Sequence, residues 1–162
     1  MRVLIVSDTH GRHSGLEQAI AEAGKIDMLV HLGDVEGGEA YIESLVDCEK
    51  HIVRGNNDFF TDLLPEEEFY IGDLHAFITH GHKYYVSLDP EQIKEEGRAR
   101  GADVVMFGHT HRPYLDEDED ITVLNPGSIS FPRQIGRQES YMIMEIADDG
   151  AVTYEQKYLE DF

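Results

Sequence analysis

The sequence predicts a single-domain protein of the α/β class, and three observations carry this prediction. Short apolar runs rich in β-branched residues recur along the first two thirds of the chain. Segments with helical apolar spacing separate these runs, which is typical of strand–helix units and a largely parallel sheet. A length of 162 residues, 41% of them hydrophobic, supplies one domain with a sizeable core. We therefore expect one domain that spans residues 1–162.

The first two thirds of the chain contain five predicted strands and three predicted helices. The strands are residues 2–6, 28–32, 51–53, 76–79 and 104–107. The helices are residues 15–23, 39–46 and 90–100. Leu16 and Ile20 share one face of the first helix, and Ser14 is placed as its N-cap. The third helix opens with Pro90, a residue common in first helical turns.

The C-terminal third changes character, because three apolar or alternating segments follow one another without a helix. They are residues 121–124, 141–146 and 152–158, and Asp-Asp-Gly at 148–150 is a hairpin turn signal. This pattern predicts antiparallel or mixed sheet. The acidic run 116–120 is interpreted as a solvated turn, with a cation site as the alternative.

Net charge and composition exclude several classes of protein. The formal charge of −20 argues against a binder of long nucleic acids and against adhesion to anionic membranes. A small anionic substrate stays compatible with this charge if the site brings its own cations. The single Cys48 suits a reducing compartment, and no apolar stretch is long enough for a signal-peptide core or a membrane span. We therefore expect a cytoplasmic protein.

Polar clusters follow all five predicted strands at the point where each strand ends. They are Asp8-Thr9-His10, Gly33-Asp34, Gly55-Asn56-Asn57-Asp58, His80-Gly81-His82 and Gly108-His109-Thr110-His111. Ligands of parallel α/β sheets bind outside the carboxyl ends of the strands, so these clusters can converge on one point. Each motif alone is weak evidence: chance gives roughly 0.8 Asp-x-His and 0.4 His-x-His triplets at this composition. Asp73-Leu74-His75 also has the first form and is interpreted as a solvated turn.

The residue types in these clusters suit divalent metal ions. Carboxylates, imidazoles and an amide oxygen favour manganese, iron, cobalt, nickel or zinc over calcium. Seven candidate ligands are too many for one tetrahedral ion and fit two ions that share a carboxylate. No thiolate takes part, which excludes a structural zinc finger.

In its ordered motifs the chain resembles the calcineurin-like metallophosphoesterase superfamily, and its small bacterial and archaeal phosphodiesterase branch in particular. The resemblance runs from Met1 to about Ser128. It implies a four-layer α-β-β-α sandwich of two mixed sheets. It also implies that Asp34 bridges two metals. The remaining implied ligands are Asp8, His10 and His111 for the first metal, and Asn56, His80 and His109 for the second.

The function that follows is metal-dependent hydrolysis of a small phosphodiester, with manganese as the first candidate and nickel, cobalt, iron or zinc as alternatives. The hypothesis is in-line attack on phosphorus by a hydroxide that bridges the two ions. Asp34 and His82 are the expected catalytic residues. Many family members carry His where this chain has Asn57, and an amide cannot serve as a general acid. We therefore expect acidic leaving groups, such as aryl ones, to be preferred.

Several residues have a competing structural interpretation. Asp8 alone could simply cap a turn. His31 is interpreted as a packed histidine or one that supports a metal ligand, and His13 and His51 as surface or core histidines. His82 could orient a metal ligand or touch substrate. Asn125 and Ser128 could pin the rim of the site, contact a phosphate oxygen or form an ordinary turn.

The functional alternatives come from other classes. One is a non-catalytic scaffold, as in the retromer scaffold subunit, which resembles this fold but has lost parts of the metal set. The others are a nuclease, a phosphomonoesterase or a protein phosphatase. The expected partner is a small phosphodiester, with no long nucleic acid and no membrane, and association into a homo-oligomer stays open.

Overall fold

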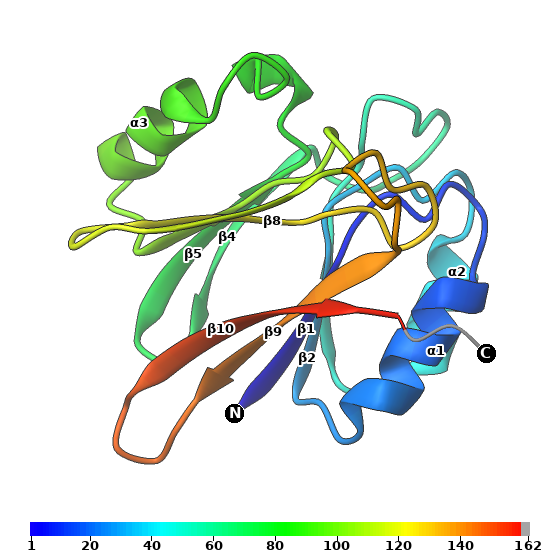
Figure 1. Ribbon diagram of the computed structural model, residues 1–162, viewed down its shortest axis with the longest axis horizontal. Helices are drawn as coiled ribbons and strands as arrows, with labels where there is room; N and C mark the ends of the chain where they lie inside the picture. Colours follow the sequence, from blue (N-terminus) through cyan, green and yellow to red (C-terminus); the bar gives the residue numbers. More distant parts are fainter. Residues whose placement is uncertain (160–162) are drawn as a thin grey trace.

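Two five-stranded sheets face each other in the computed structural model, which describes residues 1–159 (Figure 1). Residues 160–162 of the predicted domain lie outside the described part. The sheets press their inner faces together through a fully apolar layer that includes Val3 and Ile5 from one sheet and Ile78 and Met106 from the other. This layer is the central core of the molecule.

The first sheet contains both ends of the described chain, with strand order β10-β9-β1-β2-β3. Its strands are β1 (Arg2–Val6), β2 (Met28–His31), β3 (Glu49–Ile52), β9 (Ser140–Ile146) and β10 (Val152–Tyr158). The strands β1, β2 and β3 are parallel, whereas β9 runs antiparallel to both β1 and β10. The predicted hairpin at 148–150 joins β9 to β10.

The second sheet is built from the middle of the chain in the order β4-β5-β6-β8-β7. Its strands are β4 (Glu66–Ile71), β5 (Leu74–Thr79), β6 (Val104–Met106), β7 (Pro113–Glu117) and β8 (Thr122–Pro126). The three central strands are parallel, and each edge strand is antiparallel to its neighbour. The five predicted strands therefore divide between two mixed sheets.

Helices cover the outer faces and complete the four layers (Figure 1). The helices α1 (Ser14–Ala23) and α2 (Glu39–Leu45) pack Leu16 and Ile42 against the first sheet. The helix α3 (Glu91–Ala99) packs Ile93 against the second sheet, and a short 3-10 turn, η1 (His82–Tyr84), precedes it. The predicted sandwich of two mixed sheets is confirmed. Within residues 1–159, no helix has the length and apolar character needed to cross a membrane.

Two strands were not predicted, and two helix starts differ by one residue: Pro90 is the N-cap of α3 and not its first residue. The edge strands β4 and β7 escape the apolar pattern because edge strands carry polar and charged residues, here Glu66–Glu68 and the Pro-initiated β7. Ser14 is not the N-cap of α1 but its first helical residue. His13 holds the cap position and makes no side-chain capping hydrogen bond.

The acidic run 116–120 is only partly a turn, because Asp116 and Glu117 belong to β7. Its carboxylates pair with cations of α3: Lys94 Nζ lies 2.9 Å from Asp116 and 3.0 Å from Asp118. Arg98 Nε lies 2.8 Å from Asp120. The run therefore ties the edge hairpin to α3 and receives its cations from the chain itself. The motif Asp73-Leu74-His75 is also predicted from the sequence to be a solvated turn. Asp73 does lie in a turn, but Leu74 and His75 are part of β5.

Candidate metal centre

The loops that follow β1, β2, β3, β5 and β6 converge at one place between the two sheets. Five of the seven candidate ligands have a left-handed backbone, a conformation that non-glycine residues rarely adopt. These are Asp8, His10, Asp34, His109 and His111, with φ of 58°, 49°, 60°, 70° and 60°. Such strained residues persist where the surrounding structure fixes them, and they concentrate at functional sites.

Asp8, His10, Asp34 and His111 form the first group, with one ligand atom from each within 4.8 Å of the others. Asp8 Oδ1 lies 3.3 Å from His111 Nε2 and 3.7 Å from His10 Nε2. The two imidazole Nε2 atoms are 3.2 Å apart. Asp8 is fully buried, and its Oδ1 has no hydrogen-bond partner within the described chain. A buried carboxylate oxygen without a partner, faced by ring nitrogens, fits a cation-binding position.

The second group contains Asp34 as well, together with His80, His109 and Asn56. Asp34 Oδ2 lies 3.3 Å from His80 Nε2, which in turn lies 3.3 Å from His109 Nδ1. His109 Nδ1 is 3.1 Å from Asn56 Oδ1. Asp34 Oδ2 also lies 3.6 Å from His10 Nε2, so its carboxylate stands between the two groups. All seven predicted ligands are thus brought together, with Asp34 in the middle.

Hydrogen bonds on the outer side fix which ring nitrogen of each histidine faces the centre. His80 Nδ1 lies 2.7 Å from the Leu32 carbonyl, and His111 Nδ1 lies 2.6 Å from the Phe131 carbonyl. Because a carbonyl only accepts, each Nδ1 carries a proton, and in the neutral ring each Nε2 presents a lone pair inward. His10 follows the same pattern, with Nδ1 3.0 Å from Glu36 Oε1. These lone pairs and the two carboxylates fit a divalent metal of the borderline class.

Charges in the cluster are strongly coupled. Burial raises the pKa of Asp8, but the neighbouring imidazoles of His10, His111 and His80 bring it well below its ordinary value. The contact with Asp8 raises the pKa of His10 to about 9 against the opposing effect of burial. Burial lowers the pKa of His109. The carboxylates therefore stay ionised and attract positive charge, which a bound cation would supply in place of protons.

Two residues of the loop after β3 hold Asp34 in place. Asn57 donates its backbone N–H to Asp34 Oδ1 at 2.9 Å and its side-chain amide to Asp34 Oδ2 at 3.1 Å. Asp58 accepts four backbone N–H groups, from Asp34, Val35, Glu36 and Gly55, at 2.6–3.2 Å. The sequence did not predict that either residue holds Asp34 in place. Only the Gly-Asn-x-Asp motif drew attention to Asp58.

Asn125 and Ser128 pin the rim of the site. Asn125 donates its amide to Gly108 O at 3.1 Å and to Thr110 Oγ1 at 2.9 Å. Ser128 donates its hydroxyl to the Asp8 carbonyl at 2.9 Å. Both side chains are fully buried, so they shape the loops of the candidate ligands.

The remaining histidines lie at different distances from the centre. His82 has ring centroids 5.6 Å from His80 and 6.0 Å from His109, and its Nδ1 is buried with no partner in the described chain. Burial lowers the pKa of His82. His31 is a packed histidine, as predicted, and lies 3.1 Å from Thr9 Oγ1. His51 of β3 stacks on Phe69 of β4, across the two sheets, and His13 packs edge-on against Tyr41.

Comparison with known proteins identifies the class that this fold and site define. Residues 1–149 match the family model of the calcineurin-like phosphoesterase superfamily domain. The chain belongs to this superfamily, so the resemblance inferred from the motifs is confirmed.

Individual relatives agree with this assignment. The chain is 37% identical over 138 residues to the probable metallophosphoesterase MJ0623 of Methanocaldococcus jannaschii, covering 82% of this chain and 70% of that protein. It is 30% identical over 146 residues to phosphodiesterase MJ0936 of the same organism, covering 78% and 83%. A crystal structure of Vps29 with Zn²⁺ from Entamoeba histolytica has a TM-score of 0.78 at 25% identity, covering 99% and 100%.

We expect Asp58→Ala to destabilise the protein by about 3 kcal/mol or more, because it leaves four backbone donors without their charged acceptor. Urea denaturation of the metal-free protein measures this loss. Asp62→Ala removes an exposed carboxylate from the same loop and is the matched control, with an expected change below about 0.5 kcal/mol. Equal stability of the two variants would contradict the assigned role of Asp58.

A second prediction concerns pH. Burial lowers the pKa of His31 to about 4, so the folded state keeps this ring neutral while the unfolded chain protonates it near pH 6.5. The stability that this difference provides is fully present above pH 6.5 and is lost as the pH falls toward 4, by up to about 3 kcal/mol. In chelator-treated protein, His31→Gln should flatten the pH dependence of the unfolding free energy over this range. An unchanged slope would contradict the prediction.

Proposed function

We propose that this protein is a phosphodiesterase that depends on two divalent metal ions. The observation that carries the proposal is the buried convergence of two carboxylates with the inward lone pairs of His10, His80 and His111, whose outer nitrogens are all held. The phosphodiesterase name of MJ0936, a relative within the same superfamily, supports the choice of a diester over other phosphoesters.

The two groups of side chains suggest how the ions would be held. Asp8, His10 and His111 would bind one ion, and Asn56, His80 and His109 the other, with Asp34 shared between them. The nitrogen and oxygen ligands favour manganese, with nickel, cobalt, iron or zinc as alternatives. When bound, such ions supply a water of lowered pKa and neutralise phosphoryl oxygens.

The side chains of the protein set the charge of the site and the orientation of the Asp34 carboxylate. Without cations, Asp8 and Asp34 present a buried negative centre that would repel a phosphate group. The two amide contacts from Asn57 keep both oxygens of Asp34 in a fixed orientation. Asn57 is therefore committed to Asp34, and its amide has no proton to give a leaving oxygen at neutral pH.

His82 is the proposed proton donor to the leaving group. Its ring lies beside His80 and His109, and its buried Nδ1 has no partner in the part of the chain described here. Because burial lowers the pKa of His82, its contribution as an acid grows as the pH falls below 7.

The main alternative is a metal-binding scaffold of the same fold, which the likeness to zinc-bound Vps29 supports. A phosphomonoesterase or protein phosphatase would use the same metal centre with a different substrate. As part of the proposal, the substrate is a small diester rather than a long nucleic acid, and the single Cys48 favours the cytoplasm. Association into a homo-oligomer would be compatible with either function.

The decisive test uses metal-stripped protein resupplied with Mn²⁺, Ni²⁺, Co²⁺, Zn²⁺ or Mg²⁺. We expect metal-dependent cleavage of bis(4-nitrophenyl) phosphate that exceeds cleavage of 4-nitrophenyl phosphate. Asp34→Ala should lower this activity by at least about a hundredfold, because it removes the shared carboxylate. Asp62→Ala, with unchanged circular dichroism, is the control. A folded wild type with no turnover on either ester would favour the scaffold, and preference for the monoester would indicate a phosphatase.

The leaving-group dependence tests the role of His82. We expect wild-type protein to cleave aryl diesters faster than alkyl diesters in a chemistry-limited assay. His82→Ala should slow alkyl diesters by about a hundredfold and aryl diesters much less, because only a poor leaving group needs the proton. His75→Ala, at the opposite end of β5, is the matched control. Equal rates for alkyl and aryl diesters in the wild type would refute this account.

A further inference from the structure

Two adjoining hollows lie beside the candidate metal centre. The inner hollow, of about 740 Å³, is bordered by the candidate ligands His10 and His111 and by Phe131. The outer hollow, of about 460 Å³, lies between the loop after β6 and the segment before α3. Arg112 and Arg133 line both hollows, so the two hollows adjoin at these side chains and together form a recess beside the candidate metal centre.

The recess concentrates positive charge in a strongly acidic protein. Three of the eight arginines of the chain, Arg112, Arg133 and Arg137, line it, and Arg12 lies 5.1 Å from the centre of the Phe131 ring at its edge. Within residues 1–159, none of these four guanidinium groups has a carboxylate within 4.0 Å. By contrast, Arg98 on α3 and Arg100 directly after it each pair with several acidic side chains.

The backbone ties the two shared arginines to the metal centre. Arg112 directly follows His111, and its N–H is 3.2 Å from Thr110 Oγ1. The Arg133 N–H donates to the His111 carbonyl at 3.0 Å. Both guanidinium groups are therefore carried by backbone that is anchored at a candidate metal ligand, although the side chains themselves are exposed.

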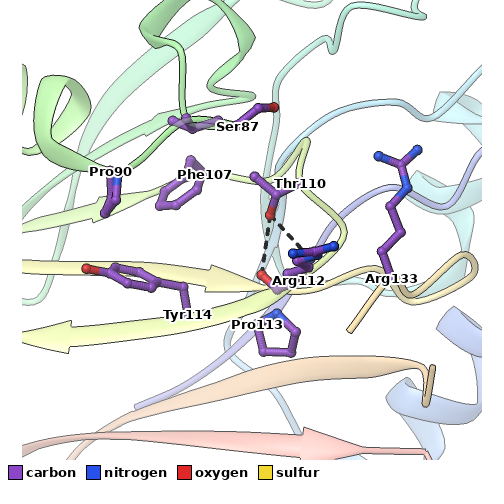
Figure 2. Close-up of a pocket in the computed structure, with 9 residues that line it drawn as sticks. Ser87, Pro90, Phe107, Thr110, Arg112, Pro113, Tyr114 and Arg133 are labelled. Carbon is purple, nitrogen blue, oxygen red and sulfur yellow. Dashed lines mark hydrogen bonds between the residues drawn. The ribbon is translucent and has the colours of Figure 1, made fainter. Parts of the chain in front are cut away.

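The other end of the outer hollow is apolar. Figure 2 shows Arg112 and Arg133 at one end of this hollow and Pro90, Phe107 and Tyr114 at the other. A ligand that reaches from the candidate metal centre into the recess would first contact the guanidinium groups and then the proline and aromatic rings. This order of chemistry fits an organic phosphate with a planar or apolar portion.

We propose that this recess is a specificity site for a second phosphoryl group, so that the preferred diester carries a further phosphate next to a planar portion, as in a phosphorylated nucleotide ester. The inference rests on the proposed phosphodiesterase function and deepens it. Arg112 and Arg133 bind the second phosphate, since guanidinium groups that have no acidic partner in the described part of the chain can form paired hydrogen bonds to its oxygens. The inner hollow also contains one carboxylate, that of Glu36, and its Oε1 is hydrogen-bonded to His10 Nδ1.

Two chromogenic substrates test the proposal, namely thymidine 5′-(4-nitrophenyl phosphate) and the same ester with a 3′-phosphate. In both, water cleaves the bond between phosphorus and the phenolic oxygen and releases 4-nitrophenolate and two protons, together with thymidine 5′-phosphate from the first ester and thymidine 3′,5′-bisphosphate from the second. The leaving group is identical, so the ratio of their kcat/KM values reports only the second phosphate. We expect the wild type to favour the phosphorylated substrate by about tenfold or more.

The double variant Arg112→Gln/Arg133→Gln should lose this preference, whereas Lys25→Gln, which removes one exposed positive charge before β2, should keep it. The lysine double variant, Arg112→Lys/Arg133→Lys, should retain part of the preference, because lysine keeps the positive charge but lacks the paired N–H donors of a guanidinium group. A wild type that cleaves both substrates equally, or a glutamine variant that keeps the preference, would overturn the proposal.

A binding measurement separates this inference from the proposed function. Calorimetry compares thymidine 3′,5′-bisphosphate with thymidine 5′-phosphate on metal-free and metal-loaded protein. We expect the wild type to bind the bisphosphate about tenfold more tightly than the monophosphate. The glutamine double variant should bind the two nucleotides with equal affinity. If no metal supports turnover, the phosphodiesterase proposal fails while this binding ratio still decides on the arginine site. Equal affinities in the wild type would reject the site in either case.

Discussion

The carboxylate of Asp58 makes the contacts on which the geometry of the candidate metal centre depends. It gathers four backbone N–H groups from the loops after β2 and β3 and thereby fixes Asp34, Asn56 and Asn57 relative to one another. A carboxylate that accepts several backbone donors is a strong interaction in a poorly solvated place. With this anchor, the left-handed backbone of Asp34 can persist, and its side chain faces both groups of candidate ligands.

The second constraint is that the site spans two sheets. Asp8, His10 and Asp34 come from the first sheet, whereas His80, His109 and His111 come from the second. The apolar layer between the sheets sets the separation of these two sets of loops. Close packing there leaves little freedom, so residues about 100 positions apart in sequence approach within 3.3 Å. Ser128 and Asn125 add local ties between the same loops.

Charge is distributed unevenly over a molecule of formal charge −20. The lysine and arginine side chains of α3 are used to neutralise the acidic hairpin between β7 and β8. Among residues 1–159, the arginines around the candidate metal centre have no such partners. A small anion would therefore be repelled over much of the surface and attracted at this one recess, particularly with metal ions in place. An acidic protein can in this way act on a small anionic substrate.

The sequence alone determined the α/β class, the seven candidate ligands and the superfamily, because strand ends and short polar motifs are local features that one chain displays directly. It failed at β4 and β7, whose edge positions remove the apolar signal. Only the tertiary structure assigned the roles of Asp58 and Asn57 and placed Arg133 beside Arg112. Those assignments depend on which loops meet once two sheets have packed, and contacts between loops distant in the chain leave no periodic pattern in the sequence.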